Sequence, residues 1–376
     1  MSLRGGLRCD SIEIPTKQSP HARRLLRHFV ARNDIITIIV KIFEPNLDLL
    51  RQALGNDVEA CRAELIKVAL GWSRVYRVTF PPQGHLTRES VVVKTMDPNG
   101  LATALEAERE LRFYQIIHPE LCIPKPKVYF LTTDEETGFH VIVMEDLSAT
   151  HYFPAHPYQW TRVEMQSVLR SYAILHTSQI ASLNYAWLAP RQESQLNFDV
   201  IPEQVAAVQG AGIWGELDEL PNLIAYARKS CERYADENMI LLHGDTTPAN
   251  SALPQNLDAQ PATLIDWQDV GIGMPEFDLA YLDLQPFESA RLIPRPELLE
   301  IYWQFRAEID SNIPPQAERR ARQLHADVVN ALWLVRPASR VALRPYPEGT
   351  YPHMHWASQF GIVYNRLKSL CCEINS

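Results

Sequence analysis

The stretch from Leu242 to Asp283 constrains this chain more than any other, because it places acidic and amide side chains after two short apolar segments. Asp245 and Asn250 follow the apolar residues 239–242, and Asp266 follows the next apolar segment. Short apolar segments bounded by polar, proline-containing loops predict two β-strands that flank a loop. Each strand would deliver an aspartate at its C-terminal end, and the two aspartates would lie side by side if the strands pair. Two carboxylates and a carboxamide that converge in this way suit a magnesium ion with bound phosphate, because hard cations take oxygen ligands.

The spacing of this stretch resembles the catalytic centre of the protein-kinase-like fold, in which H-R-D-x-x-x-x-N is followed by D-F-G. Here H-G-D-x-x-x-x-N runs from His243 to Asn250, and it is followed by I-D-W at Asp266 and D-L-A at Asp278. This variant is similar to the aminoglycoside phosphotransferase and choline kinase family, whose members are ATP-dependent kinases of small-molecule hydroxyl groups. The resemblance implies that Asp245 accepts the proton of the substrate hydroxyl and that Asn250 and Asp266 bind Mg²⁺. It also implies that His243 and Asp278 support the catalytic loop.

Composition narrows the class of protein further. A chain of 376 residues that is 46% hydrophobic can bury one large core or two. A formal net charge of −9 and a pI near 5.8 argue against a nucleic-acid-binding surface. The longest apolar run, Ile35–Phe43, is shorter than the about 20 residues that a membrane span needs. Six cysteines without a C-x-x-C pair predict free thiols in the cytoplasm; the oligomeric state is left open.

The first third of the chain predicts a small antiparallel sheet. Period-two alternation and turn residues indicate successive strands at residues 65–68, 75–80, 91–94, 124–130 and 139–144. The resemblance implies that Lys94, at the end of the third strand, contacts the α- and β-phosphates of ATP. It also places the turn at Gly71 and Ser73 over the phosphates. This turn has one glycine and a Trp72 where the kinase loop has G-x-G-x-x-G, so phosphate binding by the loop stays open.

A helix is predicted at Leu101–Ile117, since this segment is rich in Ala and Glu and has no internal Gly or Pro. Its glutamates at positions 106, 108 and 110 are candidates to pair with Lys94. The family pattern, a glutamate followed by a Phe-Tyr pair, selects Glu110. Glu145 and Leu147 then match the family hinge, whose backbone groups bind the adenine edge.

The rest of the chain predicts mostly helices. Thr161 and Glu164 form a capping box that begins a helix ending near His176. Residues 191–240 carry nine acidic and four basic side chains, which would either attract a cationic acceptor or form a solvated face. Three arginines would instead suit an anionic acceptor, and the sequence leaves this conflict open: Arg336, Arg340 and Arg344. Apolar stripes predict three further helices at residues 296–309, 316–335 and 356–370.

Together these patterns predict an α+β, two-lobed protein-kinase-like fold, with a small antiparallel-sheet N-lobe and a mostly helical C-lobe. We expect a helical N-terminal extension (1–59), a nucleotide-binding N-lobe that ends in the hinge (60–147), and a C-lobe with the catalytic loop and acceptor site (148–376).

The expected function is an ATP- and Mg²⁺-dependent phosphotransferase that acts on the hydroxyl group of a small molecule resembling an aminoglycoside, choline or an amino alcohol. Three alternatives are weaker. One is a catalytically inactive pseudokinase that serves as a binding module. A second is a protein kinase, which Gly244 and the short segment after Asp266 disfavour. A third is a metal-dependent hydrolase that uses His243, Asp245 and Asp266 directly.

Overall fold

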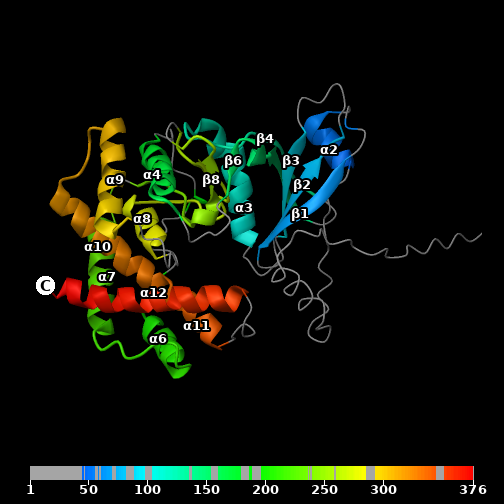
Figure 1. The fold of residues 1–376 in the computed structure, drawn as a ribbon. Helices are drawn as coiled ribbons and strands as arrows, with labels where there is room; N and C mark the ends of the chain where they lie inside the picture. The colour runs from blue at the N-terminus through cyan, green and yellow to red at the C-terminus, as the bar shows by residue number, and fades with distance from the viewer. Residues whose placement is uncertain are drawn as a thin grey trace, which may run out of the picture. The chain divides into compact units, whose positions relative to one another are not determined.

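In a computed structural model of the protein, the first strands along the chain form an antiparallel sheet (Figure 1). Its strands are ordered β1-β2-β3-β5-β4. Its members are β1 (Arg62–Ala69), β2 (Ser73–Thr79), β3 (Ser90–Met96), β4 (Val128–Thr133) and β5 (His140–Glu145). The described residues are 45, 47–55, 58, 61–69, 73–81, 89–97, 104–134, 138–153, 160–178, 186–188, 196–235, 237, 239–257, 260–284, 293–343 and 351–375, without the side chains of 68, 69, 104, 248 and 351–358. In this part of the chain no helix is both long enough and apolar enough to cross a lipid bilayer.

The two faces of the sheet bury different sets of side chains, as the alternation along each strand requires. On β5, Val141 and Val143 belong to a core that includes Leu50 of α2 (Leu47–Leu54). Ile142 and Met144 face the opposite way, into the largest hydrophobic cluster of the described chain. The sheet therefore carries a helix on one face and leaves the other for the rest of the molecule.

Helix α2 lies inside the stretch 1–59 that the sequence assigned to a helical N-terminal extension. Its leucines share a core with β2, β3 and β5, so this helix is part of the N-lobe rather than an appendage. The contacts of the chain group Phe43–Ser376 as one compact unit. The remainder of the predicted extension, residues 1–44, lies outside the described residues.

The predicted helix at Leu101–Ile117 is present from residue 104 as α3 (Ala104–Arg112), and a single π-helical turn, Phe113–Ile117, continues it. The start at 101–103 is outside the described residues. Such π turns often accompany functional sites because they rotate the side chains that follow. Here Phe113 and Ile117 are fully buried in the hydrophobic cluster that also contains Ile142 and Met144 of β5.

The second part of the chain is mostly helical. Helix α4 (Arg162–Thr177) begins with the predicted capping box, in which the Thr161 side chain and the Glu164 side chain each bond the other's backbone N–H. Five more long helices follow: α6 (Ile201–Gly210), α7 (Leu220–Tyr234), α9 (Arg295–Ile309), α10 (Gln316–Trp333) and α12 (Tyr351–Ile374). Two shorter helices, α8 (Glu276–Asp283) and α11 (Val335–Leu343), complete the set that is described. α4 packs against α9, and α12 lies along α10 and α11 (Figure 1).

Short strands between these helices carry the motif residues. They are β6 (His151–Tyr152), β7 (Ile240–Leu242), β8 (Ser251–Pro254), β9 (Thr263–Leu264) and β10 (Gly271–Gly273). The two apolar segments before Asp245 and Asp266 do form strands, β7 and β9, but they do not pair with each other. β7 pairs with β10, and β9 pairs with β8. The loop carrying Asp245 is joined to the end of β9 by a backbone bond of 2.9 Å from Ile265 N–H to the Asn250 carbonyl.

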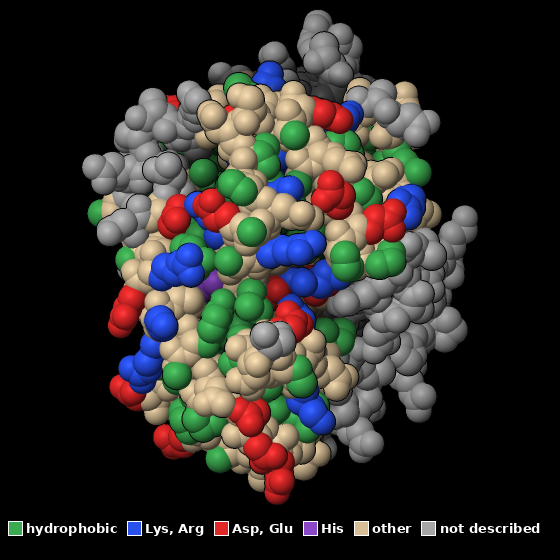
Figure 2. All heavy atoms as spheres, turned by 90° about the vertical axis from the view of Figure 1, so that its left-hand side faces the viewer, with side chains coloured by type: hydrophobic (Ala, Val, Ile, Leu, Met, Phe, Trp, Pro, Cys, Tyr) green, Lys and Arg blue, Asp and Glu red, His purple; other side chains and the backbone are tan. Residues whose placement is uncertain are grey.

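The charged side chains on one face of the helical part alternate in sign. Figure 2 shows Lys and Arg interspersed with Asp and Glu across this face, among apolar side chains. Surface pairs such as Arg170–Glu308 (3.2 Å), between α4 and α9, are of this kind. Exposed pairs of this type contribute little to stability.

Candidate active site

A lysine and two carboxylates meet where the sheet faces the helical part of the chain. Lys94 on β3 donates to both carboxylate oxygens of Glu110 on α3, at 2.7 and 2.8 Å. The same ammonium donates to Asp266 Oδ1 at 2.6 Å. Of the three glutamates on the predicted helix, Glu110 is the one that reaches Lys94, and its side chain is fully buried. One cation therefore links the strand, the helix and the segment after β9.

The charges of this group depend on one another because they are buried. Burial acts to lower the pKa of Lys94, but the carboxylates of Asp266 and Glu110 outweigh it and hold that pKa above its ordinary value. Burial also raises the pKa of Glu110 although Lys94 opposes the shift. Burial acts to raise the pKa of Asp266 as well, but the lysines at 94 and 67 hold it well below the usual range. The two lysines thus favour the ionised form of Asp266.

Asp266 has a left-handed backbone conformation, with φ at 68°, unlike every other non-glycine residue described. Aspartate tolerates this region better than most residues because its short side chain forms local hydrogen bonds. The conformation turns the carboxylate toward Lys94 while the next side chain, Trp267, points into the core, where it is fully buried. Positive φ at a non-glycine residue is typical of sites whose surroundings hold a side chain in one direction.

The loop after β7 is held by Asp278 on α8. The Asp278 carboxylate accepts from the backbone N–H groups of His243 (2.8 Å) and Gly244 (3.0 Å). Its backbone carbonyl accepts from the Thr246 hydroxyl at 2.9 Å. These three bonds hold the residues on both sides of Asp245, so the position of that side chain depends on α8.

A second layer holds Asp278 itself. His176, at the end of α4, donates from Nε2 to Asp278 Oδ2 at 3.1 Å, and its Nδ1 accepts from the Tyr302 hydroxyl at 2.8 Å. Burial lowers the pKa of His176, so the ring is neutral and this pattern of one donor and one acceptor is complete. The sequence marked His176 only as structural, and it did not indicate Tyr302, because that residue follows His176 by more than a hundred positions.

His243 uses both of its ring nitrogens within the protein. Nε2 donates to the Ile265 carbonyl at 3.0 Å, and Nδ1 accepts from the Asp245 backbone N–H at 3.3 Å. Burial lowers the pKa of His243, which favours the neutral ring. A histidine that binds a metal needs a free lone pair, and both nitrogens are engaged here. This geometry is the reason to set aside a hydrolase in which His243 is a metal ligand.

Asp245 and Asn250 lie at opposite ends of the catalytic loop and contact each other. Asn250 Nδ2 donates to the Asp245 carboxylate at 2.9 Å and to the Asp245 carbonyl at 3.0 Å. Because the amide nitrogen is directed to Asp245, the amide oxygen faces the other way. Asn250 Oδ1 and the Asp266 carboxylate remain the candidate oxygen donors for a metal.

These donors fit a magnesium ion that shares its ligands with phosphates. Mg²⁺ is usually bound by one or two protein carboxylates together with substrate phosphates and water, rather than by a full protein cage. Among the described side chains no group of three or more His, Cys, Asp or Glu is arranged to hold a metal without further ligands. An aspartate and an asparagine amide match the arrangement in which substrate phosphates and water complete the ligands of Mg²⁺.

Three aromatic rings connect the helical segment after α3 with the loop after β7. The rings of Phe113 and Trp267 stack at a centroid distance of 4.2 Å and an interplanar angle of 14°. Trp267 in turn lies 4.4 Å from the His243 ring. The sequence showed each of these residues but not their contact. The stack makes the residue after Asp266 the point at which the helix before β4, the loop after β7 and the segment after β9 meet.

The predicted hinge is anchored by the residue between the two that were selected. Asp146 accepts from Arg77 Nε and Ser90 Oγ, both at 2.8 Å, and from Ser148 N–H at 3.0 Å. The hydrogen bonds from Ser148, Ser90 and Arg77 outweigh burial and lower the pKa of Asp146. Glu145 ends β5 and bonds to the Lys127 backbone N–H at 3.0 Å, and Leu147 is buried. Asp146 thus ties the end of β5 to β2 and β3.

Gly71 and Ser73 were predicted to contact the phosphates. Gly71 lies outside the described residues. Ser73 is the first residue of β2 and is 2% exposed. Arg344, one of the three arginines considered for an anionic acceptor, is also outside the described residues, whereas Arg336 and Arg340 are exposed on α11.

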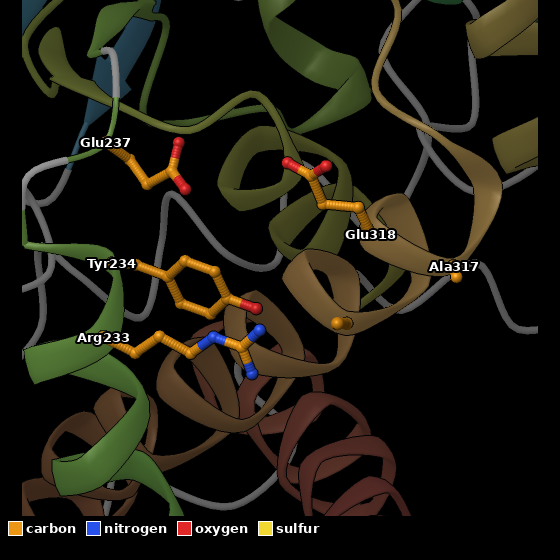
Figure 3. A pocket seen from close by; sticks show the side chains of 6 residues that line it. Arg233, Tyr234, Glu237, Ala317 and Glu318 are labelled. Atoms are coloured by element: carbon orange, nitrogen blue, oxygen red, sulfur yellow. The ribbon is translucent and has the colours of Figure 1, made fainter.

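A cavity of about 440 Å³ lies elsewhere, between the end of α7 and the start of α10. Figure 3 shows Arg233, Tyr234 and Glu237 on one side and Ala317 and Glu318 on the other. None of the candidate site residues lines it, and both glutamates are already paired with Arg322 at 2.7 and 2.6 Å. We do not assign it a role in the site.

Comparison with known proteins relates this chain to phosphotransferases. The model of the phosphotransferase enzyme family matches residues 64–322. Among curated proteins, none matches this sequence. A candidate aminoglycoside phosphotransferase from Ralstonia eutropha has the same fold, with 15% identity, a TM-score of 0.58 and coverage of 86% of this chain and 97% of its own. An ethanolamine kinase from Plasmodium vivax is 13% identical, with a TM-score of 0.54 and coverage of 97% and 98%. A microcompartment-associated aminopropanol kinase is 15% identical, with a TM-score of 0.53 and coverage of 86% and 98%. At these identities the solved structures establish the protein-kinase-like fold, as the sequence predicted.

Proposed function

Because this chain belongs to the phosphotransferase enzyme family, we propose that it is an active kinase, which transfers a phosphoryl group from ATP to the hydroxyl group of a small molecule. The observation that carries the proposal is the meeting of Lys94, Glu110 and Asp266 at 2.6 to 2.8 Å. A catalytically inactive relative would have no need to keep a buried lysine between two carboxylates, since such a group is costly to desolvate. The intact group therefore supports activity over a pseudokinase.

Some residues of the chain would position the nucleotide, and others would neutralise the charge of its phosphates. Lys94 would contact the α- and β-phosphates of bound ATP, and Glu110 orients its ammonium. Asn250 and Asp266 would hold Mg²⁺, and backbone groups of Glu145 and Leu147 would bind the adenine edge. Mg²⁺-ATP, when bound, supplies the phosphoryl group and the metal charge that neutralises the phosphate oxygens.

Asp245 acts on the acceptor. Its carboxylate accepts a hydrogen bond from the substrate hydroxyl and takes that proton late in the transfer. The Asn250 amide holds one carboxylate oxygen, so the side chain is oriented before the acceptor arrives. His243 and Asp278 keep the loop in place, and neither contacts the reacting atoms in this scheme.

The acceptor we propose is a cationic alcohol, such as an amino alcohol or an aminoglycoside. The net charge of −9 favours a positively charged ligand over an anionic one, since a field of one sign raises the local concentration of its counterion. Arg336 and Arg340 are exposed to solvent, which removes one reason to prefer an anionic acceptor. The names of two proteins of the same fold, an ethanolamine kinase and an aminopropanol kinase, make amino alcohols the first compounds to try. We place the enzyme in the cytoplasm, where ATP is available.

Asp245→Asn tests the function directly. Asparagine has nearly the same shape but cannot accept the proton, so we expect kcat to fall by about 10²- to 10⁴-fold while ATP affinity stays close to wild type. ADP release would be measured against a panel of amino alcohols and aminoglycosides, and ATP affinity by calorimetry. Asp48→Asn, at an exposed position on α2, is the matched control and should change neither.

Two results would count against the proposal. Turnover of Asp245→Asn at the wild-type rate would remove the role of the catalytic loop. ATP binding by the wild type without phosphorylation of any alcohol in the panel would favour the pseudokinase alternative.

A further inference from the structure

A second lysine, which the sequence did not single out, lies on the same carboxylate as Lys94. Lys67 on β1 places its ammonium 3.4 Å from Asp266 Oδ2, while Lys94 binds Asp266 Oδ1 at 2.6 Å. Lys67 and Asp266 are 199 positions apart in the chain. The carboxylate that we assign to the metal is therefore flanked by two cations from two different strands.

A β-bulge is what brings Lys67 to this face of the sheet. In the β1–β2 ladder Leu65 is opposite Tyr76 and Lys67 is opposite Val75, so Ile66 is an extra residue. Without it, Lys67 would point to the same face as Leu65, since side chains two apart on a strand share a face. The bulge reverses the parity and turns Lys67 to the opposite face.

That opposite face is the one that carries Lys94. Val75 is opposite Lys67 on one side and opposite Lys94 on the other, so the three residues form one row across β1, β2 and β3. Residues in one cross-strand row share a face of the sheet. Two ammonium groups thus lie in register on the side of the sheet where Asp266 is located.

The two lysines differ in how they are held. Lys94 is 6% exposed and has two carboxylate partners, whereas the Lys67 side chain is 48% exposed. The contact of Lys67 with Asp266 is long and partly exposed, and such pairs are weak. Lys67 can therefore leave Asp266 for a stronger anionic partner more readily than Lys94 can.

We propose that Lys67 is a second phosphate-binding lysine of the nucleotide site, an inference that rests on the proposed kinase function. The turn after β1 has a single glycine followed by Trp72, where the kinase loop has three glycines whose backbone approaches the phosphates. A lysine side chain on the strand before that turn supplies positive charge that the shortened glycine pattern does not. Its ammonium binds phosphate oxygens as a point charge.

Nucleotide binding without turnover tests this assignment. Lys67→Met should weaken Mg²⁺-ATP binding by about tenfold, the effect of losing one hydrogen bond to a charged group, and should leave adenosine binding unchanged. Both affinities would be measured by calorimetry. Lys67→Arg, which keeps the charge, should recover most of the ATP affinity. Arg62→Met removes a cation from the other end of β1 and should alter neither affinity.

Each other outcome overturns the assignment. Unchanged ATP affinity in Lys67→Met would show that the lysine does not reach the phosphates. Tighter ATP binding would show that Lys67 is only a counterion of Asp266 that the nucleotide must displace. An equal loss of adenosine binding, or a lower melting temperature, would show a structural role. Failure of the wild type to bind ATP would instead refute the kinase function, so the two failures are distinguishable.

Discussion

Gly244 shows how a single residue can be required for a reason other than the one its motif suggests. The sequence indicated only that glycine in place of the arginine of H-R-D disfavours a protein kinase. In the structure Gly244 has φ at +86°, and a Cβ built there would lie 1.9 Å from the Asp269 carbonyl oxygen. Backbone atoms cannot move away as the end of a flexible side chain can. No side chain of any size is compatible with this loop in its present position.

Gly244→Ala should therefore destabilise the protein by more than the about 1–2 kcal/mol that a left-handed conformation costs, and turnover should fall because the loop that carries Asp245 must shift. Gly212→Ala is the matched control, since Gly212 has φ at +72° but nothing within 4 Å of its Cβ position. It should show the conformational cost alone. Urea unfolding would measure both, and equal losses for the two variants would contradict the steric argument.

At the scale of the element, helix α8 carries both the aspartate that supports the loop after β7 and a buried carboxyl group without a hydrogen-bond partner among the described residues. Its Asp278 holds the catalytic loop, yet its first residue, Glu276, is fully buried with neither side-chain oxygen hydrogen-bonded to a described group. Burial raises the pKa of Glu276 to about 7, although the arginines at 322 and 306 oppose the shift. A carboxyl group with this pKa is partly protonated near neutral pH, so the helix carries a stability cost that depends on pH.

The variant Glu276→Gln tests whether the buried carboxyl group lowers the stability of the protein as the pH rises. The folded pKa of about 7 lies above the ordinary value of 4.5, so the contribution of the protonated group is fully present below pH 4.5 and is lost as the pH rises through 7. We expect the variant to be more stable than wild type at pH 8 by on the order of 2–3 kcal/mol, with the difference shrinking toward pH 5.

The difference between variant and wild type is the quantity to follow in unfolding experiments. Burial lowers the pKa of His176 and His243, and neutral buried histidines give the opposite slope in the same range. Glu203→Gln, at an exposed position on α6, should change stability little. A difference for Glu276→Gln that does not vary with pH would contradict the assignment.

At the scale of the whole described unit, the sheet and the helical part are joined through the residues after β9. Asp266 bonds Lys94, Trp267 stacks on Phe113, and the Gln268 carbonyl accepts from Arg109 at 3.5 Å. One hydrophobic cluster contains side chains of β3, β5, α3, α4 and α9, so it crosses the predicted boundary at residue 147. The catalytic group is thus part of the contact between the two halves, and its loss would affect folding as well as chemistry.

Lys94→Met should consequently do more than stop turnover. It leaves Glu110 and Asp266 buried near each other without their shared cation, and we expect a loss of about 3–5 kcal/mol in stability. Adding Glu110→Gln removes one of the two stranded charges and should restore part of the stability but none of the turnover. Chemical unfolding and ADP release, measured on the same preparations, separate the two effects. A double variant no more stable than Lys94→Met would show that the pair does not act as a unit.

The sequence by itself determined the family, the two-lobed fold and the pairing of Lys94 with Glu110, because the motif residues have a fixed order and spacing along short strands and loops. Local rules also determined elements such as α10 and the capping box of α4, since the partners lie within a few residues of each other. The tertiary structure alone decided that β7 pairs with β10, that His176 and Tyr302 support Asp278, and that Asp146 anchors the hinge. These contacts join residues far apart in the chain, and no local pattern encodes them. Lys67 shows the difference most clearly: period-two alternation points it to the wrong face of the sheet, and only the extra residue in the β1–β2 ladder, visible once the strands are paired, turns it to Asp266.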